Sequence, residues 1–418
     1  MHIKKITFKN SNGQSLAALL DMPVDDAPVA YALFAHCFTC SKDYKGVARV
    51  SRALAAEGVA VLRFDFTGLG QSQGDFADTT FSSNVEDLVA AASFMERELE
   101  SPAVLIGHSL GGAAVLQAAS RIPSARAVAT IGAPSSTNHL AAMLRSSAED
   151  IDSTGEAEVS IGGRSFRIRR EMVEDLSSVT MEAATESLGR ALLVLHSPVD
   201  DTVGIEHATA IFRAAKHPKS FVSLDTADHL LTGPADARYV GAVIAGWSRR
   251  YLDSDRTGRT ASQIGDDLVV VRTEKGGFRT EVLANGHPLT ADEPESVGGT
   301  DAGPSPYELL SAALGACTTM TLQMYAGRKR WPLEAAEVRL RHAKVHCEDC
   351  ADAETGSARI DRFERALELE GDLEPSQRAR LLEIADRCPV HQTLTKGVEI
   401  VTTMGESSGE ATDGESGA

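Results

Sequence analysis

The sequence predicts a doubly wound, mostly parallel α/β sheet over residues 1–252, followed by a smaller α+β domain. Two observations predict the first domain: short apolar runs recur along it, and segments of helix length separate them. A third observation separates the domains, because residues 253–265 are small, polar and without period, as in a linker. At 418 residues the chain is also too long for one ordinary core.

Six apolar runs, each flanked by turn residues, are expected to form the buried strands of the first domain. They cover residues 31–37, 59–64, 103–106, 127–131, 191–195 and 220–224, and helices are expected over 45–57, 82–99, 110–121 and 204–216. Residues 134–187 interrupt this alternation with a helix-like stretch, an alternating run and a second helix-like stretch. This interruption predicts a small cap inserted over the sheet.

The second domain is expected over residues 266–402. Its strands come first and its helices later, which predicts an α+β arrangement. A hairpin is expected around Lys275-Gly-Gly, a long helix from Pro306 to Ala326, strands near 336–346 and 359–369, and a helix over 375–387. Residues 403–418 are acidic and small, and we expect them to be disordered.

Composition excludes several classes of partner. The formal net charge of -18 would repel nucleic acid and anionic membrane surfaces. No apolar stretch has the length of a signal peptide or a membrane span, so a cytoplasmic location is expected. Six cysteines are too few for a secreted disulfide framework.

A Gly-x-Ser-x-Gly sequence at residues 107–111 directly follows an apolar run and precedes an Ala-rich helix. Its two glycines allow a tight strand-to-helix turn that lifts the Ser109 hydroxyl above the sheet edge. A serine nucleophile needs a histidine base and a carboxylate that orients it. Asp200 and His229 follow in that order, each in a loop after an apolar run. Asp200 is preferred to its neighbour Asp201 because of its spacing from the preceding strand.

An acyl-transfer site also needs backbone amides that stabilise the oxyanion. One is expected from Leu110, directly after the nucleophile, and the other from Phe38, in the loop after the first parallel strand. The neighbouring Cys37 is interpreted as a small buried filler.

Together with Arg63-Phe-Asp-Phe-Thr-Gly-Leu-Gly-Gln-Ser, these segments resemble the α/β-hydrolase superfamily over residues 1–252. The resemblance implies hydrolysis of an ester, thioester or similar bond of a small-molecule acyl substrate, through an acyl-enzyme and without a cofactor. Asp65 and Gly68 are expected to brace the loop below the site.

Two other segments, a long loop entering the apolar helix that carries Cys317 and a Cys388-Pro pair, resemble the OsmC/Ohr family over residues 266–402. The resemblance implies a homodimer. It also implies that Cys317 attacks an organic hydroperoxide, that Cys388 resolves the sulfenic acid, and that a dithiol reductant restores both. Tyr307, however, stands where family peroxidases place a glutamate.

No arginine partner for the thiolate stands out, and Arg272 and Arg279 are candidates only by their position in the chain. His342, His346, Cys347 and Cys350 invite a zinc site, but no second ligand pair is near them in the sequence, so no metal is expected.

Three functions therefore stay open. The chain is a serine hydrolase fused to a hydroperoxide reductase, or a hydrolase with a non-catalytic module for dimerisation or ligand binding. The third is a peroxide reductase with a degenerate hydrolase, against which the complete Ser, Asp, His order argues.

Overall fold

The computed structural model describes residues 2–24, 27–37, 40–137, 151, 155–161, 164–252, 269–273, 275–285, 287–346 and 359–404. Two compact units divide the chain: Met1–Lys275 with Thr280–Thr290, and Gly276–Arg279 with Ala291–Ala418. The expected linker at 253–265, most of the expected tail at 403–418, and Phe38 lie outside the described residues.

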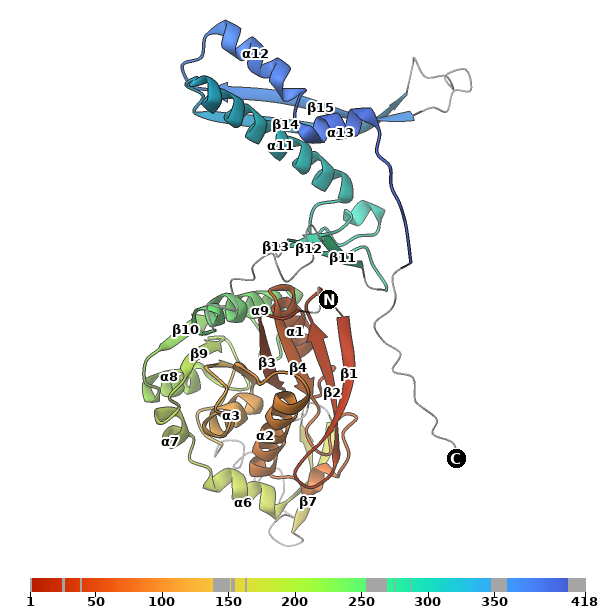
Figure 1. Ribbon diagram of the computed structural model, residues 1–418. Coiled ribbons are helices and arrows are strands. Elements are labelled where there is room, and N and C mark those ends of the chain that lie inside the picture. The colour runs from red at the N-terminus through yellow and green to blue at the C-terminus, as the bar shows by residue number, and fades with distance from the viewer. Residues whose placement is uncertain are drawn as a thin grey trace, which may run out of the picture. The chain divides into compact units, whose positions relative to one another are not determined.

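An eight-stranded sheet forms the centre of the first unit, in the order β1-β2-β4-β3-β5-β6-β9-β10 (Figure 1). Strands β3, β4, β5, β6, β9 and β10 pair in parallel, whereas β1 and β2 form an antiparallel edge. This confirms the predicted fold class. The strands are β1 (His2–Lys9), β2 (Ser15–Met22), β3 (Ala30–Ala35), β4 (Val59–Phe64), β5 (Val104–His108), β6 (Ala127–Ile131), β9 (Ala191–His196) and β10 (Lys219–Ser223).

Helices cover both faces of this sheet. Buried side chains of α1 (Lys45–Ala56) and α9 (Pro234–Ser248) share one core with one face of the strands. On the other face the core includes α2 (Phe81–Glu98), α3 (Leu110–Ala118) and α8 (Ile205–Ala214). Because the central strands are apolar on both sides, the two helix layers bury β3, β4, β5, β6 and β9 completely, whereas the edge strands β1 and β10 stay partly exposed.

Between β6 and β9 the chain forms an antiparallel hairpin and two short helices. They are β7 (Glu156–Ile161), β8 (Arg164–Arg169), α6 (Arg170–Ser178) and α7 (Met181–Glu186). Met172 and Leu176 of α6 are buried in the main core. The first predicted helix of the cap falls on residues 138–150, outside the described residues.

The second unit is built on α11 (Pro306–Lys329), which packs on the antiparallel pair β14 (Ala335–His346) and β15 (Arg359–Glu370). Helices α12 (Pro375–Ala385) and α13 (Pro389–Lys396) follow. Strands β11 (Val269–Thr273), β12 (Thr280–Ala284) and β13 (His287–Ala291) form a separate sheet, which belongs to the first unit except for Ala291, and the predicted hairpin is β11–β12. Among the described residues, no helix has both the length and the apolar character of a membrane span.

His108, the last residue of β5, connects the end of this strand to the segment between β10 and α9. Its side chain is buried, and its Nε2 donates to the backbone carbonyl of His229, 2.7 Å away in the segment between β10 and α9. Burial, followed by the neighbouring His229, lowers the pKa of His108 from 6.5 to about 4. The imidazole is therefore neutral in the folded protein at neutral pH.

Acid should destabilise the first unit through His108. The unfolded state binds the proton near pH 6.5 and the folded state only near pH 4, so this stability is present above pH 6.5 and is lost as the pH falls. From pH 7 to pH 4 the loss is about 3 kcal/mol of unfolding free energy. In His108→Gln, which does not titrate, that part of the loss should vanish.

Denaturant unfolding followed by fluorescence of Trp247 in a Trp331→Phe background measures the difference, because the chain has two tryptophans, one in each unit. If the unfolding free energies of wild type and His108→Gln fell with pH by the same amount, His108 would not be the source of the acid sensitivity.

Candidate active site

The turn from β5 to α3 carries Ser109 in a backbone conformation that few residues adopt, with φ of 55° and ψ of -125°. The Ser109 amide donates to the carbonyl of Ile131 at 2.8 Å, which fixes the turn to β6. A Cβ on Gly107 would lie 2.3 Å from the carbonyl oxygen of Gly111. A Cβ on Gly111 would lie 2.4 Å from that of Ala35, so both positions require glycine.

Hydrogen bonds join Ser109, His229 and Asp200 into one chain. The Ser109 Oγ lies 3.0 Å from His229 Nε2, and His229 Nδ1 lies 2.7 Å from Asp200 Oδ2. The three residues come from the ends of different elements: β5, the segment after β10, and the loop after β9. The structure therefore brings together all three residues that the sequence pattern singled out. This is the arrangement in which a histidine can accept a serine proton and a carboxylate can orient the imidazole.

Asp200 is held as an oriented carboxylate. Its Oδ1 accepts the amides of Thr202 and Val203, each at 2.9 Å, which leaves Oδ2 for His229. Burial alone would raise the pKa of Asp200, but the hydrogen bond from His229 and that from the Val203 amide keep it below 3.8. Asp201 is exposed, in agreement with the preference for Asp200.

Gly132 and His108 belong to the site although the sequence analysis missed them. Gly132 has φ of +55°, and a Cβ there would lie 3.3 Å from both Asp200 Oδ2 and His229 Nδ1. Its signal was a glycine directly after a predicted strand. The His108 side chain positions His229 because its Nε2 donates to the backbone carbonyl of His229.

Leu110 begins α3, so its amide belongs to the positive end of that helix. The other expected oxyanion donor, Phe38, lies outside the described residues and stays a prediction. The structure does describe the residues shortly before Phe38. The carbonyl oxygens of Ala35 and His36 would lie 2.4 and 2.5 Å from a Cβ at Gly111. The loop after β3 thus touches the first turn of α3.

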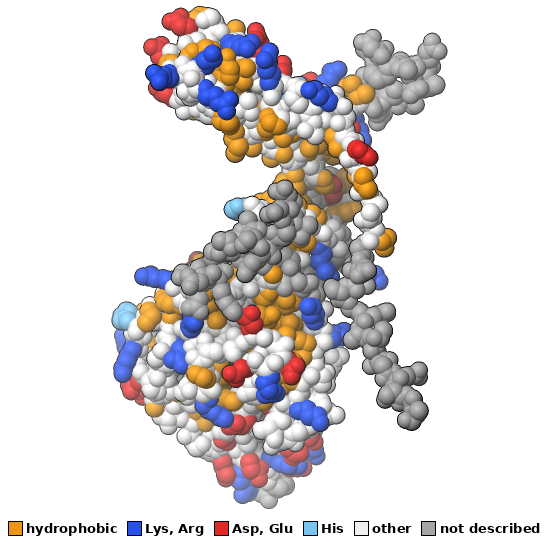
Figure 2. Space-filling model, viewed as in Figure 1, with side chains coloured by type: hydrophobic (Ala, Val, Ile, Leu, Met, Phe, Trp, Pro, Cys, Tyr) orange, Lys and Arg blue, Asp and Glu red, His pale blue; other side chains and the backbone are white. Residues whose placement is uncertain are grey.

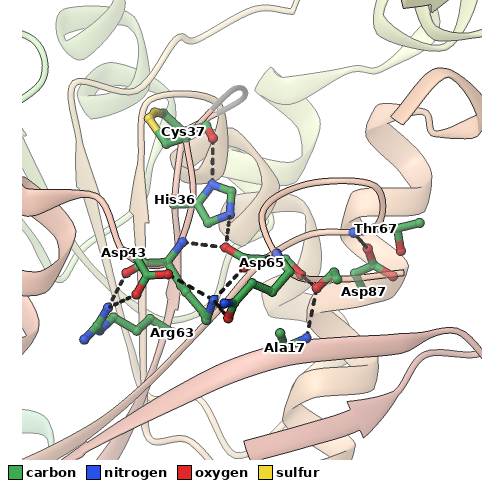
Figure 3. A network of polar contacts seen from close by, with 12 residues as sticks. Ala17, His36, Cys37, Asp43, Arg63, Asp65, Thr67 and Asp87 are labelled. Atoms are coloured by element: carbon green, nitrogen blue, oxygen red, sulfur yellow. Dashed lines mark hydrogen bonds and ion pairs between the residues drawn. A yellow bond between two sulfur atoms is a disulfide. The ribbon is translucent and has the colours of Figure 1, made fainter. Parts of the chain in front are cut away.

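A buried ion cluster holds the far end of this loop (Figure 3). Asp65 accepts the Lys42 amide at 2.6 Å and the Lys42 ammonium at 2.7 Å, and all these atoms belong to buried side chains or backbone. Arg63 Nε donates to Asp21 at 2.6 Å, and its Nη1 donates to the carbonyl of Lys42. Removing one partner would leave an uncompensated buried charge, which costs about 3–5 kcal/mol. Asp65 thus stabilises the end of this loop through Lys42, in agreement with the structural role expected for it.

A disulfide joins Cys37 to Cys40. The interpretation of Cys37 as a mere filler is therefore wrong, although its side chain is buried. The sequence carries a local signal of this bridge in its Cys-x-x-Cys spacing.

In the second unit, Cys317 and Cys388 are free thiols. Cys317 lies on α11 and is half-buried, and the next residue, Thr318, places its Oγ1 3.6 Å from the buried Sγ of Cys388. Cys388 also caps α13, with its sulfur 3.4 Å from the amide of His391.

The arginine that reaches this network is Arg365 on β15, not one of the two candidates. Its Nη1 donates to Thr318 Oγ1 at 3.0 Å, and its Nη2 donates to Asp386 at 2.7 Å and to His391 Nδ1 at 3.1 Å. Arg272 lies on β11, and Arg279 directly precedes β12. Because Arg365 lies on a strand that is distant in sequence from both cysteines, no local pattern in the sequence pointed to it.

Two residues at the start of α11 have structural roles. Glu308 accepts the amide of Ser305 at 2.7 Å in a capping box. Tyr307 stacks on His342 with ring centroids 4.2 Å apart. Cys347 and Cys350 lie outside the described residues.

Two family models match the chain. The model described as "Alpha/beta hydrolase family" covers residues 32–298, and the model described as "OsmC-like protein" covers residues 299–403. The first match spans more than half of the chain.

Individual proteins match the hydrolase part. The solved structure of an esterase domain from a Rhodothermus marinus protein is 53% identical, covers 60% of this chain and 100% of its own, and superposes with a TM-score of 0.51. The solved structure of Est1E of Butyrivibrio proteoclasticus with bound ferulic acid is 21% identical, covers 59% of this chain and 98% of its own, and has a TM-score of 0.52; it shows the fold alone.

A mitochondrial palmitoyl-protein thioesterase, ABHD10 of Rattus norvegicus, is 28% identical over 145 residues. That match covers 35% of this chain and 46% of the rat protein, so it spans less than half of the relative. The fold, the strand-to-helix turn and the family match agree: the chain belongs to the α/β hydrolase family and carries an OsmC-like α+β domain after its hydrolase domain.

Proposed function

We propose that the hydrolase domain is a serine esterase or thioesterase that works through an acyl-enzyme on Ser109. The observation that carries the proposal is the chain of hydrogen bonds from Ser109 through His229 to Asp200. Serine is a weak nucleophile at neutral pH, and an adjacent oriented imidazole is what such a hydroxyl needs to react.

In the first half-reaction, Ser109 Oγ attacks the carbonyl carbon of the substrate while His229 Nε2 takes its proton. The negative charge that develops on the carbonyl oxygen faces the amide of Leu110 at the start of α3. His229 then gives the proton to the leaving alcohol or thiol. Asp200 keeps Nδ1 protonated, so that Nε2 is the basic nitrogen.

In the second half-reaction, His229 removes a proton from water, which attacks the acyl carbon and frees Ser109 Oγ. The bond between the carbonyl carbon and Ser109 Oγ then breaks, His229 returns the proton to Ser109 Oγ, and the carboxylic acid leaves. The amide of Leu110 faces the oxyanion of both tetrahedral intermediates.

The relatives support an ester or a thioester as the bond. One solved relative is an esterase domain, and another relative is a palmitoyl-protein thioesterase. In both bonds the acyl carbon carries a leaving group, an alcohol or a thiol, to which His229 can give the proton, so both can use the same acyl-enzyme route.

A panel of p-nitrophenyl esters and acyl thioesters of increasing chain length, assayed with the full-length protein, tests the proposal. Wild type should hydrolyse members of the panel, and Ser109→Ala should lower kcat by about 10⁶-fold, to a rate set by binding and the oxyanion donors. If the alanine variant kept most of the activity, Ser109 would not be the nucleophile.

Two adjacent aspartates provide a matched control. Asp200→Asn should lower kcat by about 10³–10⁴-fold, because an amide cannot hold His229 in the required tautomer. Asp201→Asn should stay near wild type, since Asp201 is exposed and bonds to Thr202. Equal effects of the two substitutions would exclude Asp200 as the orienting carboxylate.

A second activity is favoured by one observation in the OsmC-like domain: Thr318, the neighbour of Cys317, contacts the sulfur of Cys388. We propose that Cys317 and Cys388 together reduce organic hydroperoxides. The Cys317 thiolate attacks the outer peroxide oxygen and releases an alcohol. The resulting sulfenic acid then forms a disulfide with Cys388 and releases water, and a dithiol reductant restores both thiols.

Peroxide consumption by wild type and Cys317→Ser, with dithiothreitol as the reductant, tests this second activity. The serine variant should lose the thiol-dependent rate, since an alcohol cannot form a sulfenic acid. Equal rates would leave the domain as a non-catalytic module for dimerisation or ligand binding.

We also propose that the OsmC-like domain forms a homodimer. Met320 and Met324, one turn apart on α11, are 65% and 59% exposed, and Figure 2 shows hydrophobic side chains gathered on this unit. Apolar surface of this kind marks protein interfaces.

Sedimentation equilibrium should give twice the 44.3 kDa chain mass, and Met320→Glu with Met324→Glu should return the chain to a monomer. A wild-type monomer at micromolar concentration would refute the dimer.

A further inference from the structure

His196, the last residue of β9, contacts the loop that carries Asp200. Its side chain is fully buried. Its Nε2 lies 2.7 Å from the backbone carbonyl of Val203, and since a carbonyl can only accept, Nε2 is the donor. The amide of Val203 in turn donates to Asp200 Oδ1 at 2.9 Å. A single residue, Val203, therefore connects this imidazole to the carboxylate that orients His229.

The two ring nitrogens of His196 are used unequally. Nδ1 is buried, and no group in the part of the chain that the structure describes forms a hydrogen bond with it. A buried polar atom without a partner costs free energy, so a position that only filled the core would favour an apolar side chain. What a histidine adds at this position is the bond from Nε2 to the carbonyl of Val203.

The imidazole of His196 also contacts the other carboxylate oxygen. Its Nε2 lies 3.7 Å from Asp200 Oδ2, the oxygen that His229 Nδ1 contacts at 2.7 Å. The longer distance is a packing contact and the shorter one a hydrogen bond. His196 thus restrains both oxygens of Asp200, one through the Val203 amide and the other by direct contact.

The ends of β5 and β9 share one arrangement. The buried His108 at the end of β5 donates through Nε2 to the carbonyl of His229, and His196 at the end of β9 makes the equivalent bond to Val203. Both strands are fully buried, so their ends are fixed by the packing of the sheet. Each histidine therefore connects a fixed strand end to the segment that carries one partner of Ser109.

We propose that His196 is a positioning residue for the orienting carboxylate: by fixing Val203, it holds Asp200 where His229 needs it during proton transfer. The inference rests on the proposed serine hydrolase function. His196 neither gives nor takes a proton in the reaction, and it acts only through Asp200.

Glutamine and asparagine at position 196 separate the two ring nitrogens. A glutamine amide can place its N–H where Nε2 lies, whereas the shorter asparagine amide reaches only the place of Nδ1. His196→Asn should lower kcat by about 10²-fold, the effect of misplacing a reacting group by about 1 Å, and His196→Gln should recover most of that loss. KM should change little, because the carboxylate acts only when the proton moves. Hydrolysis of p-nitrophenyl esters by the full-length protein gives both constants.

A double-mutant cycle tests through which residue His196 acts. In the Asp200→Asn background the carboxylate is already gone, so His196→Asn should lower the remaining kcat by less than about twofold. A residue that only supported the fold would give the same loss in both backgrounds. The rate at which a fluorophosphonate labels Ser109, followed by mass analysis, gives the same comparison without an ester substrate.

A second variant covers the case in which His196→Asn does not fold, since it buries an amide without a partner. His196→Leu removes the bond to Val203 without burying a new polar side chain. It should lower kcat and the labelling rate as much as asparagine does. Circular dichroism and gel filtration identify the folded variants.

Three results would overturn the inference. Wild-type kcat in the folded asparagine or leucine variant would leave the hydrolase proposal standing without a role for His196. A loss in His196→Gln as large as that in His196→Asn, or equal losses in both backgrounds of the cycle, would assign the effect to packing. If the wild type neither hydrolyses an ester nor reacts with the fluorophosphonate at Ser109, the proposed function fails, and the inference fails with it.

Discussion

The close packing of α3 against β3 and β5 is the constraint on which the rest of the site depends. Ser109 can occupy its left-handed conformation because Gly107 and Gly111 let three backbone segments meet without a Cβ between them. Strain of this kind costs on the order of 1–3 kcal/mol and persists only where the surroundings enforce it. Here the surroundings are the fully buried strands β5 and β6, whose packing fixes both ends of the turn.

Polar groups beneath the site extend this constraint to the loops. His108 holds the segment that carries His229, the amides after Asp200 hold its carboxylate, and Asp65 with Lys42 holds the loop after β3. The hydrogen bonds from His108, from the Lys42 ammonium and from the Val203 amide are buried, so each is worth more than the same contact in water. The reacting groups are thereby positioned before a substrate arrives, which is how enzymes avoid reorganisation in the transition state.

Much of this could be predicted from the sequence. Apolar runs located the six parallel strands of the sheet, and the order of Ser109, Asp200 and His229 located the three residues that the fold unites, because strand ends and motif spacing are local signals. Gly132 carried only the signal of a glycine directly after a predicted strand, and His108 and Arg365 carried no local signal of their roles. Their roles come from contacts with residues far away in the chain, and no short pattern records such contacts. The Cys37–Cys40 bridge did have a local signal, the Cys-x-x-Cys spacing.

The central claim is that Ser109 is an activated nucleophile, and covalent labelling tests it most directly. The full-length protein is treated with a fluorophosphonate, which reacts with activated serines, and the adduct is located by peptide mass mapping. The account predicts a single adduct on Ser109, formed much more slowly when Asp200 is replaced by asparagine. A folded wild-type protein that forms no adduct, or that carries it on another serine, would contradict the account.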